Sequence, residues 1–198
     1  RTEGIQHLPK ILDITQKDLT VAYLPLAHIA ERLLGHFLKL VYGNQTAFAE
    51  SIEDMPNNIR QVGPSILFGT PRVFEKFYAK IATGISDASW IQKKIYHWAI
   101  GIGKEISIAK GSNSFILKLK VWLAKYLIYN KIKDIFGGRI RYMISGAAPI
   151  SPKILNFFKW MNITILEGYG MTETTGIISI NLPHAVKIGS VGKPYPNT

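Results

Sequence analysis

The segment EGYGMTETTG concentrates small, polar and charged residues between the apolar runs ITIL and IISI. Gly168 and Gly170 would let a ligand approach the main chain closely, and Tyr169 between them offers an aromatic face suited to a planar base. The Thr172 hydroxyl and the amides around it could donate hydrogen bonds to a phosphate oxygen. These residue types in this order could together hold a nucleotide.

Glu173 in the same segment is a candidate metal ligand. Mg²⁺ is commonly held by one or two carboxylates together with the phosphates of a substrate. The alternative is a solvated turn that opens a helix, in which Thr172 and Glu173 would be capping residues. The spacing of the residues leaves both interpretations open.

Two further segments place reactive or small residues after apolar runs. The loop SGAAPIS follows RIRYMIS, and Gly146, Ala147 and Ala148 would let a flat ligand lie against the main chain. A tight connection between a strand and a helix would also require small residues there. His28, just past the run LTVAYLPL, could contact a carboxylate or another anion, although a lone histidine is commonly a packing residue. Glu31 is expected on the solvated face of the helix that follows.

The composition limits the class of protein. The chain has 198 residues, is 47% hydrophobic and can bury one substantial core. It contains no cysteine, which excludes disulfides, thiolate metal sites and a cysteine nucleophile, and it points to a reducing cytoplasm. The net charge of +11 favours an anionic partner. No apolar run is long enough to span a bilayer, and residues 1–10 lack the apolar core of a signal peptide.

Three apolar runs are each followed by a helical pattern. The expected strands are 19–26, 65–69 and 139–145, and the helices after the second and third begin with Thr70-Pro71 and Ser151-Pro152, a cap followed by a first-turn proline. This alternation predicts an α/β fold, a layered and mainly parallel sheet flanked by helices. Such sheets bind ligands at the carboxyl ends of their strands, where both glycine-rich segments are expected to lie.

The helix after the first strand is expected to bury one apolar face. The residues at helical spacing on that face are Ile29, Leu33, Phe37, Leu40 and Val41.

Residues 89–136 follow a different pattern, with two long helical stretches closed by Gly137-Gly138. The second stretch, 115–136, is basic and amphipathic, and its lysines are Lys118, Lys120, Lys125, Lys131 and Lys133. It could lie on an anionic membrane surface, or it could be an ordinary packed helix whose lysine stems cover apolar surface. A basic nucleic-acid-binding module is a further alternative, but clustered basic residues interleaved with aromatics are missing, and no nucleic-acid partner is expected.

Five segments resemble, in this order, motifs of the adenylate-forming (AMP-binding) enzymes: YLPLAHIAER, GTPRVFEKFY, SGAAPIS, YGMTET and IGSVGKPYP. The long helical stretch before GGRIRYMISGAAP is similar to that of one branch of this family, the long-chain fatty-acid–CoA ligases. The resemblance implies that 1–198 is the central part of an AMP-binding domain with a helical insertion at about 89–136. It implies a phosphate-binding loop before Arg1 and a C-terminal domain after Thr198, so the chain alone is expected to be inactive.

The resemblance also implies roles for the matching residues. Tyr169 would stack on adenine, with Gly146, Ala147 and Ala148 on the other side of the ring. Thr172 would contact the α-phosphate, Glu173 would coordinate magnesium, and His28 would border the acyl carboxylate. The rest of the two nucleotide-binding segments would be formed by Ser145, Glu167, Gly168, Gly170 and Met171.

The implied reaction has two steps. A fatty-acid carboxylate attacks the α-phosphorus of ATP and forms an acyl-adenylate, and the thiol of CoA then displaces AMP. The expected small molecules are therefore a fatty acid, ATP or AMP, Mg²⁺ and CoA as a substrate. The expected location is cytoplasmic with peripheral membrane contact, and the alternatives are another acid–thiol ligase or a non-catalytic module that binds membranes or nucleic acid.

Overall fold

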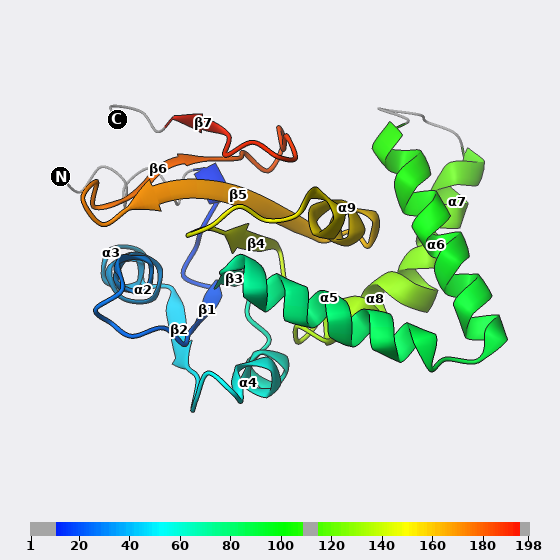
Figure 1. The fold of residues 1–198 in the computed structure, drawn as a ribbon, viewed down its shortest axis with the longest axis horizontal. Coiled ribbons are helices and arrows are strands. Elements are labelled where there is room, and N and C mark those ends of the chain that lie inside the picture. The colour runs from blue at the N-terminus through cyan, green and yellow to red at the C-terminus, as the bar shows by residue number, and fades with distance from the viewer. Residues whose placement is uncertain (1–10, 109–114, 195–198) are drawn as a thin grey trace.

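A seven-stranded sheet organises the computed structural model, which describes residues 11–108 and 115–194. The strands of these residues are β1 (Leu19–Ala22), β2 (Gln45–Phe48), β3 (Ile66–Gly69), β4 (Tyr142–Ser145), β5 (Thr164–Met171), β6 (Gly176–Ile180) and β7 (Lys193–Pro194). They lie in the order β2-β1-β3-β4-β5-β6-β7 (Figure 1). β1 to β5 are parallel, whereas β6 runs antiparallel to β5 and β7. The parallel order 2-1-3-4-5 is a doubly wound order, so the predicted α/β fold is confirmed.

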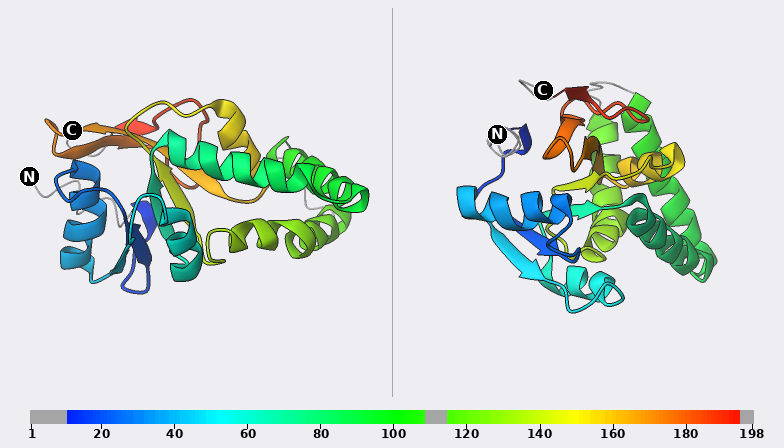
Figure 2. Two further views of the ribbon diagram at one scale, coloured as in Figure 1. Left: turned by 60° about the horizontal axis from the view of Figure 1, so that its bottom comes forward. Right: turned by 60° about the vertical axis from the view of Figure 1, so that its left-hand side comes forward.

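Helical segments connect the parallel strands. They are α2 (Ile29–Glu31), η1 (Arg32–Phe37), α3 (Leu38–Tyr42), α4 (Met55–Val62), α5 (Pro71–Ser86), α6 (Trp90–Ile108), α7 (Phe115–Ala124), η2 (Lys125–Tyr129), α8 (Asn130–Asp134) and α9 (Pro152–Trp160). η1 and η2 are π-helical stretches within longer helices. The two helical stretches expected in 89–136 are present as α6 and as α7–η2–α8, which pack together at the end of the molecule away from β1 and β2 (Figure 2).

Apolar side chains cover both faces of the sheet. Ile66 and Ile144 face the helix formed by α2, η1 and α3, whereas their neighbours Leu67 and Met143 face the larger core under α5, α6 and α9. Successive residues of a strand point to opposite faces, so a strand buried on both faces must be apolar throughout. This is why the runs that predicted β3 and β4 were continuous rather than alternating.

The prediction of the buried face of the helix after β1 was wrong for the second half of that helix. Leu33, Leu34 and Leu38 are buried, whereas Phe37 and Leu40 are exposed. The reason is η1, because i→i+5 hydrogen bonding adds a residue to the turn and shifts every later side chain around the helix axis. Spacing based on 3.6 residues per turn therefore fails beyond Leu33.

The other differences concern short elements. β2 and α4 were not expected, since β2 is a four-residue edge strand of mixed polarity. The first strand ends at Ala22 rather than at residue 26. Ser151 caps α9 as predicted, because its hydroxyl accepts from the Lys153 amide at 3.3 Å, whereas Thr70 occupies the cap position of α5 without a side-chain capping hydrogen bond.

A buried aspartate joins three parallel strands at their amino ends, opposite the ligand-binding edge. Asp18 accepts hydrogen bonds from the Ser65 hydroxyl at 2.6 Å, the Thr15 amide at 2.8 Å and the Arg141 guanidinium at 2.9 Å. Burial alone would raise the pKa of Asp18, but these hydrogen bonds and the charge of Arg141 hold that pKa below its ordinary value. The ion pair therefore links the starts of β1, β3 and β4.

The contact of α6 with α9 gives a first prediction. A Cβ atom at Gly103 would lie 2.1 Å from the Trp160 carbonyl oxygen, whereas a Cβ atom at Gly101, two residues earlier, would meet no atom within 4 Å. Gly103→Ala should therefore destabilise the protein by about 1–3 kcal/mol through overpacking. Gly101→Ala should stabilise it by about 0.5–1 kcal/mol, because alanine is the better helix former. Urea unfolding of the two variants would measure both effects, and equal effects would contradict the packing of α6 on α9.

Candidate functional site

A hollow of about 80 Å³ lies at the carboxyl ends of the parallel strands. One side is formed by Ser145, Gly146 and Ala147 at the end of β4, and another by residues 168–170 of β5. His28, Ile29 and Ala30 border the hollow at the start of α2, and its remaining lining residues are Leu33, Leu34, Phe68, Ile144, Gly176 and Ile177. The fold therefore brings together three segments that were singled out separately in the sequence.

Ser145 lines the hollow at the end of β4, and its hydroxyl is buried. The residue is 2% exposed, and its Oγ has no hydrogen-bond partner within the described part of the chain. A buried polar atom without a partner costs free energy, and the exceptions found in proteins call for a specific explanation.

The loop after Ser145 holds a strained backbone. Ala147 has φ of 70°, a left-handed conformation that is uncommon for a residue with a Cβ atom. Such residues persist where the surrounding structure determines them, and they gather at binding sites. Gly146 and Ala147 line the hollow, whereas Ala148, the next predicted residue, is exposed and does not.

Tyr169 is 46% exposed and lines the hollow from β5. Its neighbours Gly168 and Gly170 line the hollow as well, but the structure gives Gly170 a second reason to lack a side chain. A Cβ atom there would lie 2.1 Å from the Gly176 carbonyl oxygen of β6. The close pairing of β5 with β6 therefore requires glycine at this position, whether or not a ligand is bound.

The segment EGYGMTETTG does not lead from a strand into a helix. Residues 167–171 belong to β5, and Thr172–Thr175 form the turn of a hairpin into β6, closed by a hydrogen bond of 3.0 Å from the Thr175 amide to the Thr172 carbonyl oxygen. Because no helix starts here, the alternative role of Thr172 and Glu173 as helix caps is excluded.

Three predicted residues lie at this hairpin, beyond the lining of the hollow. Met171, Thr172 and Glu173 are exposed. Glu173 makes no hydrogen bond or ion pair with any described residue, so its carboxylate is available to a cation. Residues 11–108 and 115–194 contain no group of three or more potential metal-ligating side chains. A metal at the hairpin would therefore need ligands from a bound substrate.

Glu167 points away from the hollow, toward the segment before β7. Its carboxylate accepts a hydrogen bond of 2.9 Å from the Gly189 amide, and burial raises its pKa. Asn181, which is 1% exposed, holds the same segment through hydrogen bonds with Lys187 and Ser190. In this structure Glu167 supports β5 from behind.

His28 lies at the rim of the hollow, at the N-cap of α2. Its Nδ1 atom accepts from the Ala30 amide at 3.2 Å, and its side chain is exposed. Glu31, expected on the solvated face, is instead 6% exposed. Its Oε2 atom accepts from the amides of Tyr23 and Leu24 at 3.2 and 3.0 Å. The carboxylate thereby fixes the start of the loop that carries His28.

Glu31 gives a second prediction. Glu31→Ala should destabilise the protein by about 2–4 kcal/mol, because two amides lose their acceptor. Glu31→Gln keeps an acceptor oxygen and should cost far less.

The same residue predicts a dependence of stability on pH. Burial raises the pKa of Glu31 above its ordinary value of 4.5. The contribution of its protonated form to the free energy of unfolding is therefore present below pH 4.5 and is lost as the pH rises through the folded-state pKa. Urea unfolding at several pH values should show this decline in the wild type and not in Glu31→Gln.

Phe68, Leu33 and Ile177 line the hollow but were not expected to do so. Phe68 is the next-to-last residue of the parallel strand β3, and a position near the carboxyl end of a strand is a signal that could have identified it. Leu33 was predicted only as a residue of the buried face of the first helix, and Ile177 has no signal because its position depends on the hairpin. A second hollow of about 240 Å³ lies between α9, β5 and residues 183–188, and it contains none of the predicted site residues.

The family is decided by a match over almost the whole chain. Residues 2–198 match the sequence profile of the AMP-binding enzymes. The chain belongs to the AMP-binding enzyme family. The resemblance inferred from YGMTET and SGAAPIS is therefore confirmed, and the hollow between these two segments lies in a domain of this family.

Similar proteins agree with this assignment. The chain is 35% identical over 181 residues to a long-chain-fatty-acid–CoA ligase of Xenopus laevis, and the aligned region covers 89% of this chain and 24% of the relative. It is 34% identical over 191 residues to long-chain-fatty-acid–CoA ligase 5 of Mus musculus, and the aligned region covers 96% of this chain and 27% of the relative. The chain thus spans about a quarter of the length of these curated relatives.

Solved structures show the same fold at low sequence identity. O-succinylbenzoate coenzyme A synthetase of Bacillus subtilis, in complex with ATP and magnesium ion, has a TM-score of 0.59 at 17% identity over 97% of this chain and 30% of that chain. MatB of Rhodopseudomonas palustris without ligand has a TM-score of 0.61 at 16% identity, and the match covers 98% of this chain and 29% of that chain.

Proposed function

We propose that this AMP-binding enzyme chain is part of a long-chain fatty-acid–CoA ligase and that the hollow holds the adenine of ATP and of the acyl-adenylate. The observation that carries the proposal is the meeting of the exposed Tyr169 ring with the main chain of Gly146 and Ala147 at one hollow. An adenine ring has a flat apolar face, which the Tyr169 ring matches, and a polar edge, which main-chain groups match.

The phosphates of ATP would extend from the hollow toward the hairpin of β5 and β6. Thr172 would donate a hydrogen bond to the α-phosphate, and Glu173 would hold Mg²⁺. The residues fit this role, because an exposed carboxylate without a protein partner matches the way in which Mg²⁺ uses few protein ligands and several phosphate oxygens. When bound, the ion would offset the negative charge of the phosphates.

His28 would border the carboxylate of the acid, on the α2 side of the same hollow. With Glu31 fixing the preceding loop, His28 would be positioned before substrate binds. The carboxylate would attack the α-phosphorus with release of pyrophosphate, and the thiol of CoA would then attack the acyl carbon with release of AMP. The alternative is an acid–thiol ligase with a different acid.

The proposal includes a cytoplasmic location with peripheral contact to a membrane, and it includes no nucleic-acid partner. The helices of residues 11–108 and 115–194 are each too short or too polar to cross a bilayer.

ATP–pyrophosphate exchange tests the function. The complete protein should incorporate labelled pyrophosphate into ATP when a long-chain fatty acid is supplied, and little without acid. Short-chain and aromatic acids are the controls that separate the proposal from its alternative. Exchange with these acids and none with long-chain acids would leave the family intact but overturn the proposed substrate.

A further inference from the structure

One face of α7 and η2 carries apolar side chains that the fold leaves uncovered. Phe115, Leu119, Trp122 and Tyr126 recur at spacings of four, three and four residues, so they lie along one side of the helix. Their exposed fractions are 79%, 50%, 62% and 69%. We call these four residues the outer stripe. The rings of Trp122 and Tyr126 stack on each other, with centroids 6.3 Å apart.

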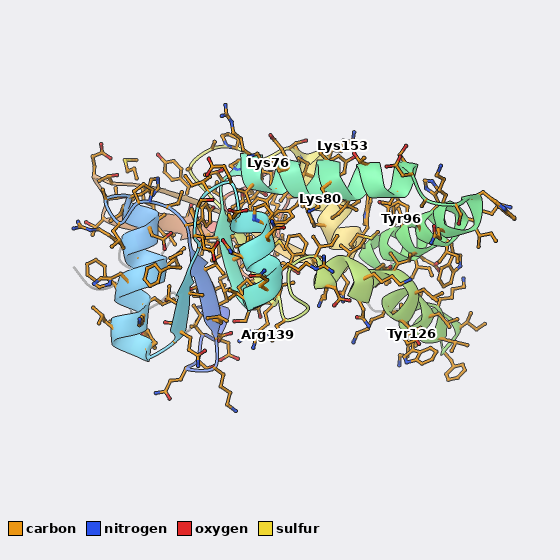
Figure 3. The ribbon with its side chains drawn as sticks, turned by 90° about the horizontal axis from the view of Figure 1, so that it is seen from below. Lys76, Lys80, Tyr96, Tyr126, Arg139 and Lys153 are labelled. Atoms are coloured by element: carbon orange, nitrogen blue, oxygen red, sulfur yellow. The ribbon has the colours of Figure 1, made fainter. Side chains whose placement is uncertain are left out.

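The outer stripe is not the face that packs on the protein. Leu117 and Ala124 are buried, and Ala124 belongs to the larger core. A surface helix normally turns a polar face to the solvent. Here the inner side is enclosed, and the open side carries the apolar outer stripe, which is therefore available to a partner outside the described fold. Figure 3 shows Tyr126 projecting from the ribbon on the side opposite Lys76 of α5.

The charges beside the outer stripe have one sign. Lys118 and Lys125 are exposed and lie next to Leu119 and Tyr126 in the sequence. The described segment from Phe115 to Lys133 contains five lysines and no aspartate or glutamate. A surface of apolar and aromatic side chains flanked by cations is complementary to an anionic lipid surface, in which tryptophan and tyrosine occupy the headgroup level.

We propose that the outer stripe docks the protein on an anionic lipid bilayer. This inference deepens the membrane contact of the proposed function by naming the surface that makes it. A long-chain fatty acid partitions into bilayers, so docking would bring the enzyme to its substrate. An acidic protein partner or a second copy of the chain would also cover apolar residues, but a second copy would bring the same lysines together and would be repelled.

Vesicle co-sedimentation of the complete protein, without ATP, fatty acid or CoA, tests the proposal. The protein should bind vesicles of phosphatidylcholine that contain about 30% phosphatidylserine, which mimic an anionic membrane leaflet. Lys118→Gln/Lys125→Gln should weaken binding at least about tenfold, since each lysine near such a surface contributes a several-fold factor. Trp122→Ser should weaken it about tenfold as well through lost apolar contact.

Matched variants separate the outer stripe from the overall charge. Lys76→Gln/Lys80→Gln removes the same charge from exposed positions of α5, and it should leave vesicle binding within about twofold. Equal losses in the two lysine pairs would overturn the proposal, as would binding that is unchanged in Trp122→Ser. Sedimentation velocity without lipid should give the same mass for wild type and Trp122→Ser. A dimer that Trp122→Ser dissociates would assign the outer stripe to self-association instead.

Because no substrate is present, this test does not depend on catalysis. A wild-type protein that binds no vesicles but shows normal ATP–pyrophosphate exchange would overturn the docking surface alone. Normal vesicle binding without exchange on any acid would overturn the proposed function alone.

Discussion

Glu173→Gln should lower the rate of fatty-acid-dependent ATP–pyrophosphate exchange by about 100-fold at low magnesium, the size of effect seen when one electrostatic contact to a reacting centre is removed. Glutamine keeps the shape of the side chain but replaces an anionic ligand with a neutral amide. Because the expected defect is in binding the metal, the rate should partly recover as magnesium is raised. A magnesium titration of the exchange rate measures this directly.

The control for this variant is Glu53→Gln. Glu53 is also an exposed glutamate, but it lies between β2 and α4, far along the chain from the β5–β6 hairpin. Its exchange rate should match that of the wild type at every magnesium concentration. A Glu173→Gln enzyme with a normal rate throughout the titration would show that this carboxylate holds no catalytic metal.

Tyr169→Ala should raise the KM for ATP by about tenfold or more, because stacking of one base on an aromatic side chain contributes about 1–3 kcal/mol. Tyr169→Phe keeps the ring and should remain within about threefold of the wild type. The side chain is 46% exposed, so neither change should reduce folding stability appreciably. Steady-state kinetics with saturating fatty acid separates the effect on KM from any effect on kcat.

Tyr126→Ala provides a matched truncation at a distance from the hollow. Tyr126 is 69% exposed on η2. In an assay without lipid, its removal should leave the KM for ATP unchanged. If Tyr169→Ala and Tyr126→Ala behaved alike, Tyr169 would have no special contact with the nucleotide.

The sheet and the strand-end loops were predictable because their signals are local. Continuous apolar runs identify strands buried on two faces, and Ser151-Pro152 marks the start of α9. The same reasoning failed for Glu31, which forms hydrogen bonds with the loop before it rather than with solvent. A carboxylate on a helix is solvated in most proteins, and only the path of the chain from Tyr23 to His28 buries this one.

The hollow itself was only partly predictable. Ser145, Ala147 and Tyr169 were identified from motifs, and the structure brings them to one place. Glu167 belongs to the same motif but supports the segment around Gly189, which is a contact across 22 positions. The π-helical η1, which leaves Phe37 exposed and buries Leu34, has no signal in a pattern of 3.6 residues per turn.

The central claim is that the hollow between the β4 loop and β5 binds adenine, and photolabelling with 8-azido-ATP tests it most directly. After irradiation and proteolysis of the complete protein, mass spectrometry should find the label on peptides that contain residues 145–148 or 168–171. Excess ATP should prevent this labelling. Protectable label on residues 183–188 or on Lys159, which line the second hollow, would contradict the account.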